Sequence, residues 1–202
     1  MSELSAEDRK DIQLMLAVQT GDLQAYEMLF KKYEKPIYNF FISLGSGRTH
    51  AEDLMQETFL RLWKSCSHYN PQGKFSTYLF QIAKNAFLSF IAKKKRLRET
   101  SFAADTDNAG QEYSFEAKTA SPEQSLEQAE TAAIIQKAID KLDEKHRLVF
   151  VLAHYQDLKY AEISEVLDIP VGTVKTRMMH AEKKLREILK PFFTKDEKDN
   201  TS

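Results

Sequence analysis

The chain has 202 residues, 42% of them hydrophobic and 29% charged, which is the ordinary balance of a globular protein. Its net charge of −1 is unevenly distributed: residues 1–98 carry 15 basic against 10 acidic side chains, and residues 99–127 carry one against seven. A single cysteine, Cys66, excludes an intrachain disulfide, and no apolar run approaches the roughly 20 residues that cross a bilayer. We therefore expect a cytoplasmic protein without membrane insertion, whose basic first part contacts nucleic acid.

Apolar residues recur at spacings of three and four, and glycine and proline are scarce, which together predict an all-α fold. A first helix is expected over residues 6–19, and Asp22 is expected to cap a longer helix that Pro36 kinks or splits. Thr49 and Glu52 have the spacing of a capping box for a third helix that runs to Ser65. The apolar face of that helix is expected to comprise Ala51, Leu54, Met55, Thr58, Phe59, Leu62 and Trp63.

The third helix also carries an exposed polar stripe, made of Asp53, Gln56, Glu57, Leu60, Arg61 and Lys64. Acidic and amide groups beside an exposed leucine suit the docking of a basic partner helix. A face that simply contacts water is the alternative.

A fourth helix is expected over residues 75–98, with its core side chains at Phe75, Leu79, Ile82, Ala83, Ala86 and Phe90, and with Phe80 and Phe87 also buried. Its opposite face carries Tyr78, Gln81, Lys84, Asn85 and Leu88, and its basic end includes Lys93, Lys94 and Arg96. This combination suits single-stranded nucleic acid, because bases stack on rings and cations hold the phosphates. For the basic end, a solvated helix terminus is the alternative.

Residues 99–121 are acidic, polar and aperiodic, so we expect a flexible linker there. Order is expected to resume with Ser121 as a cap and Pro122 in the first helical position. Four further helices are expected at about 122–140, 144–155, 160–167 and 171–189, followed by a frayed tail over 191–202. The prediction is two small helical domains, residues 1–98 and 122–190, joined by an acidic tether.

Residues 159–185 have the form of a helix-turn-helix, with a short "DIP" turn between the two helices. The side chains expected to pack inward are Ala161, Ile163, Val166, Leu167, Val174, Met178, Ala181, Leu185 and Ile188. The second helix then presents Thr173, Lys175, Thr176, Arg177, Met179, His180, Lys183 and Lys184 outward. A helix fits the major groove of DNA, where such side chains donate to guanine or meet the thymine methyl. Basic residues that only favour the helix dipole are the alternative.

With these motifs in place, the chain resembles the sigma-70 family of bacterial RNA polymerase sigma factors, in its extracytoplasmic-function group. The segment "AEDLMQETFLRLWK" resembles the polymerase-binding signature, and "FSTYLFQIAKNAFLSFIAKKKR" resembles the segment that melts and reads the −10 element. The helix-turn-helix resembles the domain that reads the −35 element; the matches are jointly specific, and "AEDL.QETFLR.W" and "GTVK.R" are the strongest of them. The resemblance makes residues 1–98 region 2 and residues 122–190 region 4.

The resemblance implies a role for each set of site residues. Those implied to bind core RNA polymerase, at the clamp of its largest subunit, are Asp53, Leu54, Gln56, Glu57, Leu60 and Arg61. Those implied to face the −10 element are Tyr78, Gln81, Lys84, Asn85, Lys93, Lys94 and Arg96, with the loop from His68 to Lys74 accepting an everted base. Those implied to enter the −35 major groove are Thr173, Lys175, Thr176, Arg177, Met179, His180 and Lys183.

The implied partners are core RNA polymerase, at its clamp and flap, and promoter DNA. Many relatives are held inactive by an anti-sigma factor, and the open positions of Leu60 and Leu88 motivate the hypothesis that this chain has one. A free-standing helix-turn-helix regulator is the alternative, but it leaves the first domain without a role. An enzyme is not expected: the five histidines are scattered, no phosphate loop is present, and we assign no catalytic residue, metal ligand or cofactor.

Overall fold

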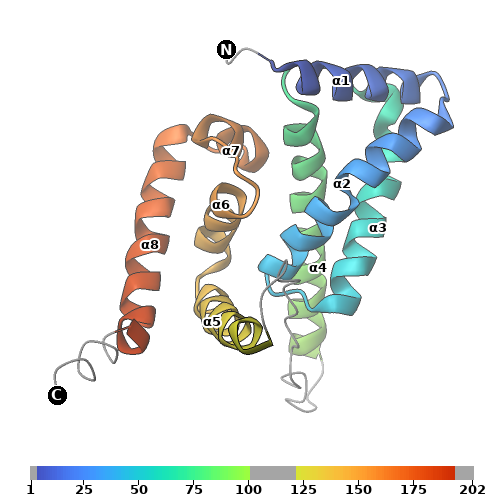
Figure 1. Cartoon of the computed structure of the whole chain (residues 1–202). Coiled ribbons are helices and arrows are strands. Elements are labelled where there is room, and N and C mark those ends of the chain that lie inside the picture. The colour runs from blue at the N-terminus through green and yellow to red at the C-terminus, as the bar shows by residue number, and fades with distance from the viewer. Residues whose placement is uncertain (1–3, 101–121, 194–202) are drawn as a thin grey trace, which may run out of the picture.

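The computed structural model describes residues 4–100 and 122–193, and every element within these ranges is helical. In chain order the elements are α1 (Ala6–Gln19), α2 (Leu23–Ser43), α3 (Arg48–Ser65), the 3₁₀ turn η1 (Cys66–His68), α4 (Phe75–Thr100), α5 (Pro122–Asp140), α6 (Glu144–His154), α7 (Tyr160–Leu167) and α8 (Val171–Phe193). Figure 1 shows α1 to α4 as one bundle and α5 to α8 as a second bundle beside it. The all-α prediction is confirmed.

The α1–α4 bundle is held by large apolar side chains that come from all four helices. Met15, Phe40, Phe41, Leu62 and Leu79 are completely buried. Burying one such side chain stabilises the fold by about 1.5–3 kcal/mol. The α3 and α4 helices are thereby fixed side by side, which matters because both carry predicted site residues.

A buried carboxylate fastens α1 to α2. The Asp11 side chain is 3% exposed, and it accepts hydrogen bonds from Lys32 Nζ at 2.7 Å and from the Tyr33 hydroxyl at 2.6 Å. Burial, together with the bond to Asp11, raises the pKa of Tyr33 far above its ordinary value, so the phenol stays protonated as the donor.

The start of α3 differs from the sequence prediction, whereas α1 and α2 follow it. Asp22 caps α2 by accepting from the backbone amides of residues 24 and 25, and α2 then continues unbroken through Pro36. The capping box assigned to Thr49 and Glu52 is wrong: Gly47, at φ 74°, precedes the first helical residue. Thr49 therefore lies inside the first turn, where its side chain cannot act as the cap.

The buried face of α4 is close to the one predicted. Phe75, Leu79, Ala83 and Ala86 are buried, as are Phe80 and Phe87, whereas Ile82 and Phe90 are half-buried and pack at the edge of the core. On α3, Trp63 is 37% exposed rather than buried, because its ring packs edge-on against Tyr26 at the rim of the bundle, with centroids 5.2 Å apart.

The α5–α8 bundle contains the expected helix-turn-helix. The line Val174, Met178, Ala181 and Leu185 of α8 is buried, and so are Ile163 and Val166 of α7. The turn is made by Asp168, which ends α7 in the left-handed region at φ 54°. Ala161 is exposed, so its assignment to the packed side was wrong, and Leu167 and Ile188 are half-buried.

The two bundles touch along α7, which lies against α4, and at the C-terminal end of α2, where Gln136 of α5 donates to the Ser43 carbonyl at 3.2 Å and Arg147 of α6 donates to the Leu44 carbonyl at 2.9 Å. Most of the predicted linker, the Ser121 cap and the tail from residue 194 lie outside the described residues.

Candidate nucleic-acid and polymerase interfaces

The outer face of α8 presents most of the side chains predicted to read the −35 element. Lys175, Thr176, His180 and Lys183 are exposed and Met179 is 59% exposed, whereas Thr173 and Arg177 are half-buried. The Thr176 hydroxyl donates to the carbonyl oxygen of Gly172 at 3.0 Å within the helix. A row of cations with one exposed apolar side chain matches the chemistry of a major groove, which offers acceptors and the thymine methyl.

Sequence reasoning missed a support beneath this face. The ring of His146, on α6, lies 5.8 Å from the ring of His180, and its Nδ1 is 3.4 Å from the Asp143 carboxylate. Burial, with a smaller effect of Lys145 and His180, lowers the pKa of His146 below its ordinary value. The sequence around His146 gave no indication of this contact, because His146 and His180 lie on different helices and far apart in the chain.

The face of α4 that was predicted to bind a single strand is brought together as expected, but part of it is engaged within the protein. Tyr78 and Ser65 share a hydrogen bond between their hydroxyl groups at 3.0 Å. Gln81 Nε2 donates to the backbone carbonyl of Glu165, on α7, at 2.8 Å. Asn85 is exposed and Lys84 is half-buried.

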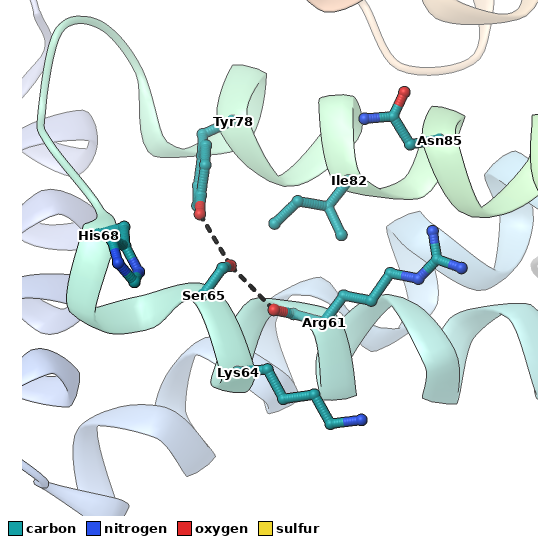
Figure 2. A pocket seen from close by; sticks show the side chains of 7 residues that line it. All are labelled: Arg61, Lys64, Ser65, His68, Tyr78, Ile82 and Asn85. Atoms are coloured by element: carbon teal, nitrogen blue, oxygen red, sulfur yellow. Dashed lines mark hydrogen bonds between the residues drawn. The ribbon is translucent and has the colours of Figure 1, made fainter.

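A cavity of about 470 Å³ opens between α3 and α4, beside this face. Its lining residues are Arg61, Lys64, Ser65, His68, Tyr78, Ile82 and Asn85, as Figure 2 shows. The Arg61 guanidinium points toward the Asn85 amide across the cavity, the ring of Tyr78 stands on the α4 side with Asn85, and the Lys64 ammonium points away from α4. Ser65, which orients Tyr78, was not among the predicted site residues. A cavity with cations on one side and an aromatic ring on the other fits a nucleotide.

The loop before α4 is anchored to the bundle by the buried Tyr69. Tyr69 is buried, and its ring lies 5.0 Å from the ring of Tyr78; burial raises its pKa to about 12. Gln19 of α1 donates to the Tyr69 carbonyl at 2.7 Å. The loop that was predicted to accept a base is thus tied to the bundle at Tyr69, while His68 remains exposed.

The outer face of α3 carries the exposed stripe predicted from the spacing: Asp53, Gln56 and Glu57 are exposed and Leu60 is 52% exposed. Leu54, to which the resemblance gave a polymerase-binding role, is 6% exposed and packs in the core, on the apolar face where the spacing placed it. The Arg61 guanidinium donates to Glu57 at 2.7 Å, one helical turn apart. The face is therefore an ordered strip of charges with a leucine at its centre.

At the basic end of α4, Lys93 and Arg96 are exposed and Lys94 is half-buried. Leu88 is half-buried and packs against the core, so it is not an open apolar side chain. Among the residues that the structure describes, no helix is long and apolar enough to span a membrane, and no cluster of three His, Cys, Asp or Glu side chains is placed to hold a metal ion.

Comparison with known proteins gives two family matches: Sigma-70 region 2 over residues 29–97, and Sigma-70 region 4 over residues 132–185. The ECF RNA polymerase sigma factor SigW of Bacillus subtilis is 35% identical over 178 residues, which cover 86% of this chain and 93% of SigW. The RNA polymerase sigma-H factor of Pseudomonas aeruginosa is 28% identical over 184 residues, 91% of this chain and 95% of that factor.

Two solved structures share the fold. CnrH, in complex with the cytosolic domain of CnrY, has a TM-score of 0.66 at 22% identity, covering 90% of this chain and 98% of CnrH. The sigma factor RpoE of Bartonella quintana, in complex with the anti-sigma factor NepR, has a TM-score of 0.63 at 22% identity, covering 83% and 98%. Sigma-70 proteins are not a known enzyme family. The chain belongs to the extracytoplasmic-function group of the sigma-70 family and is a sigma factor, which binds core RNA polymerase and directs it to promoters.

Proposed function

We propose that three surfaces divide the work of promoter selection. The outer face of α3 binds the clamp of the largest polymerase subunit, the open face of α4 binds the −10 strand, and α8 enters the −35 major groove. Residues 1–98 then act as the region 2 domain, residues 99–121 as the linker and residues 122–190 as the region 4 domain. The protein carries out no chemistry of its own and acts in the cytoplasm.

The observation that supports this proposal most is the arrangement around the 470 Å³ cavity. It places Tyr78 and Asn85 of the −10 set next to Arg61 of the polymerase-binding set. A strand bound along α4 would therefore lie beside the polymerase-binding face. The melted strand would therefore lie close to the polymerase subunit that is bound to α3.

A charge swap on α3 tests the polymerase-binding surface. The double variant Glu57→Lys plus Arg61→Glu keeps an ion pair one turn apart but inverts the charges that a partner meets, so the helix should stay folded. We expect its affinity for core polymerase to fall about 10-fold or more. The matched control is Glu27→Lys plus Lys31→Glu, which swaps an exposed pair of the same spacing on α2 and should bind normally.

The same proteins should then be used for transcription from a genomic fragment library. The proposal requires specific transcripts from core plus wild-type protein and their loss with the α3 swap. Specific duplex binding without core, together with no binding to core, would instead identify a free-standing helix-turn-helix regulator.

For the −35 surface, Lys175→Ala should weaken binding of the polymerase complex to promoter DNA and reduce the salt slope of log K by about 1, as the loss of one phosphate contact does. Lys137→Ala, on the exposed side of α5, should leave both unchanged. Equal effects of Lys175→Ala and Lys137→Ala on DNA affinity and on the salt slope would show that Lys175 of α8 does not contact the promoter DNA.

An anti-sigma factor is a further proposed partner. Leu60, half exposed in the centre of the α3 strip, is a site that such a partner would cover, and both structural relatives were solved with a bound partner. Leu88 gives no support, because it packs against the core. Purification from uninduced cells should recover the partner with the wild type and lose it with Leu60→Asp.

A further inference from the structure

Helix α1 lies outside the part of the chain that matches Sigma-70 region 2, which begins at residue 29. Figure 1 shows this helix lying across the end of the first bundle, where α3 finishes and α4 begins. The segment between those two helices contains the loop from His68 to Lys74, to which the family resemblance gives the everted base. Helix α1 is therefore next to a recognition loop to which neither the sequence pattern nor the family match connected it.

The last residue of α1 binds the first part of this segment. Gln19 Nε2 donates to the Cys66 carbonyl at 2.9 Å and to the Tyr69 carbonyl at 2.7 Å. A side-chain amide nitrogen carries two hydrogens, so each carbonyl receives one of them. The Cys66 carbonyl also accepts from the backbone amide of Tyr69 at 3.0 Å, which closes the turn η1. One side chain therefore bonds to both ends of that turn and fixes where the loop leaves it.

The end of α1 is itself a fixed support for Gln19. Met15 and Val18, in the last turns of the helix, are buried in the core. The hydroxyl and the backbone amide of Thr20 both donate to the Ala17 carbonyl, at 2.8 Å and 3.0 Å, which closes the helix directly after Gln19. The amide of Gln19 thus reaches the loop from a helix end that is packed and hydrogen-bonded.

The first turn of α1 lies next to the other end of the loop. Asp8 Oδ2 is 3.7 Å from Lys74 Nζ, and it accepts from the backbone amide of Ser5 at 2.9 Å as part of the capping box. Burial opposes ionisation of Asp8, but the bonds from Ser5 and the charges of Lys74 and Lys32 outweigh burial and lower its pKa. Lys74 also pairs with Glu162 of α7 at 3.0 Å, so Asp8 shares this cation. The Gln19 bonds are therefore the main hold of α1 on the loop.

Between these two contacts the loop presents its tip to solvent. Asn70, Pro71 and Gln72 are exposed, whereas Tyr69 is buried with its ring 5.0 Å from the ring of Tyr78. Asn70 and Gln72 also line a cavity of about 360 Å³, which the loop forms with residues of α4 and α7. Side-chain amides bond to the edges of unstacked bases. A base that enters this cavity would meet two amides whose backbone α1 holds in place.

We propose that α1 is a positioning helix for −10 recognition: Gln19 holds the loop so that Asn70 and Gln72 meet the everted base in one orientation. This inference rests on the −10 role proposed above for α4. A loop that is ordered before binding loses little conformational freedom when the base enters, so the hold favours binding. It also makes the loop selective, because a fixed loop leaves the polar groups of a wrong base unpaired. Gln19 is thus a positioning residue and contacts no base itself.

The first test removes the donors of Gln19 and keeps its shape. In Gln19→Glu the side chain only accepts, so both carbonyls lose their donor. The matched control, Gln13→Glu, makes the same change at an exposed site of the same helix. The probe is a pool of random single strands of about 12 nucleotides; the complex of each protein with core polymerase binds the pool, and the bound strands are sequenced against core alone. We expect Gln19→Glu to reduce the base preference at one position about 10-fold, and the preferences at the other positions less than about 2-fold, whereas the control keeps them all.

A second variant separates the lost hydrogen bonds from the added charge. Gln19→Met removes the donors without adding a charge, and Gln13→Met is its control. Hydrogen exchange of the free protein then measures the loop: we expect the amides of residues 66–74 to exchange about 10-fold faster in both Gln19 variants, while those of α2 and α4 stay as protected as in the controls. Base preferences that are equal in the Gln19 and Gln13 variants would overturn the positioning role, and so would a uniform loss of preference at every position.

Tyr78→Ala separates this failure from failure of the α4 assignment. If Tyr78→Ala changes the base preferences of the complex and the Gln19 variants do not, α4 reads the strand and only the role of α1 is wrong. If the wild-type complex shows no base preference, or if Tyr78→Ala leaves its preferences unchanged, the −10 role of α4 is itself wrong, and the inference falls with it.

Discussion

Asp11 differs from the rest of the α1–α4 core because it is a charged group that water does not reach. Its carboxylate is satisfied by one cation, Lys32, and by the Tyr33 hydroxyl. A buried pair of this kind adds little to stability compared with apolar packing, but removal of the carboxylate leaves the Tyr33 hydroxyl without its acceptor. The contact therefore fixes how α1 crosses α2.

We predict that Asp11→Ala lowers the free energy of unfolding of the α1–α4 bundle by about 1–3 kcal/mol, because the Tyr33 hydroxyl loses its buried acceptor, whereas Lys32 keeps its pair with Glu7 at 3.0 Å. Urea unfolding followed by circular dichroism measures the change. Glu27→Ala, which breaks the exposed pair with Lys31, should leave the midpoint unchanged. Similar shifts in both variants would mean that Asp11 acts only through surface charge.

At the scale of elements, helices α6 and α8 meet through two imidazole rings. His146 faces His180 on α8, Lys145 on its own helix and Asp143 just before that helix, and Asp143 is also paired with Lys184 of α8 at 3.8 Å. Because burial lowers the pKa of His146, the unfolded chain binds a proton more readily than the folded one just below pH 6.5.

We therefore predict that the α5–α8 bundle loses stability as the pH falls from about 6.5 through the lowered pKa of His146, and that above this window the contribution is constant. Thermal unfolding at a series of pH values measures it. His146→Gln should reduce the dependence in this range, whereas His50→Gln, on α3, should not. An unchanged profile in His146→Gln would assign the effect to other groups.

Periodicity predicted most elements because it reports which side of a helix is buried. The inner line of α8 and the inner face of α4 followed from spacings of three and four alone. The start of α3 did not, because the positive φ of Gly47 lets the helix begin before the Thr49 signal. The bond from Gln81 to Glu165 joins residues 84 positions apart, and no local pattern marks such a pair.

Residue roles were less predictable than helices for the same reason. The resemblance gave Leu54 a polymerase-binding role, but a family signature does not say which of its side chains point inward, and the helical spacing, which placed Leu54 on the apolar face, predicted its burial correctly. Ser65 and His146 orient predicted site residues from other helices, and neither has a sequence signal.

At the scale of the whole molecule, the two bundles meet where the backbone at Gly45 turns. Its φ of 79° favours glycine, and an added β-carbon would lie 2.7 Å from Asp140 and 3.3 Å from Arg147. Gly21 has a similar φ of 92° with nothing within 4 Å of that position. A substitution at Gly21 therefore tests backbone strain alone, whereas the same substitution at Gly45 tests strain together with crowding between the bundles.

We predict that Gly21→Ala destabilises the protein by about 1–2 kcal/mol through backbone strain alone. Gly45→Ala should cost about a further 1 kcal/mol, because the added methyl group displaces the ends of the Asp140 and Arg147 side chains and disturbs the Arg147 bond to the Leu44 carbonyl, and it should also loosen the contact between the bundles. Urea unfolding gives the first quantity, and the distance between spin labels on α3 and α8 gives the second. If the two alanine variants have the same free energy of unfolding and the same distance between the spin labels, crowding at Gly45 contributes nothing to stability or to the contact between the bundles.

The hydrogen bonds that Gln136 and Arg147 donate to the carbonyls at the end of α2 have a consequence for the order of events during synthesis. A ribosome adds about 5–20 residues per second, so Arg147 is made roughly 2–9 s after Thr100. For that interval the carbonyl groups at the end of α2 lack the donors that Gln136 and Arg147 later supply. The last turn of α2 is therefore completed only after most of the second bundle has been synthesised.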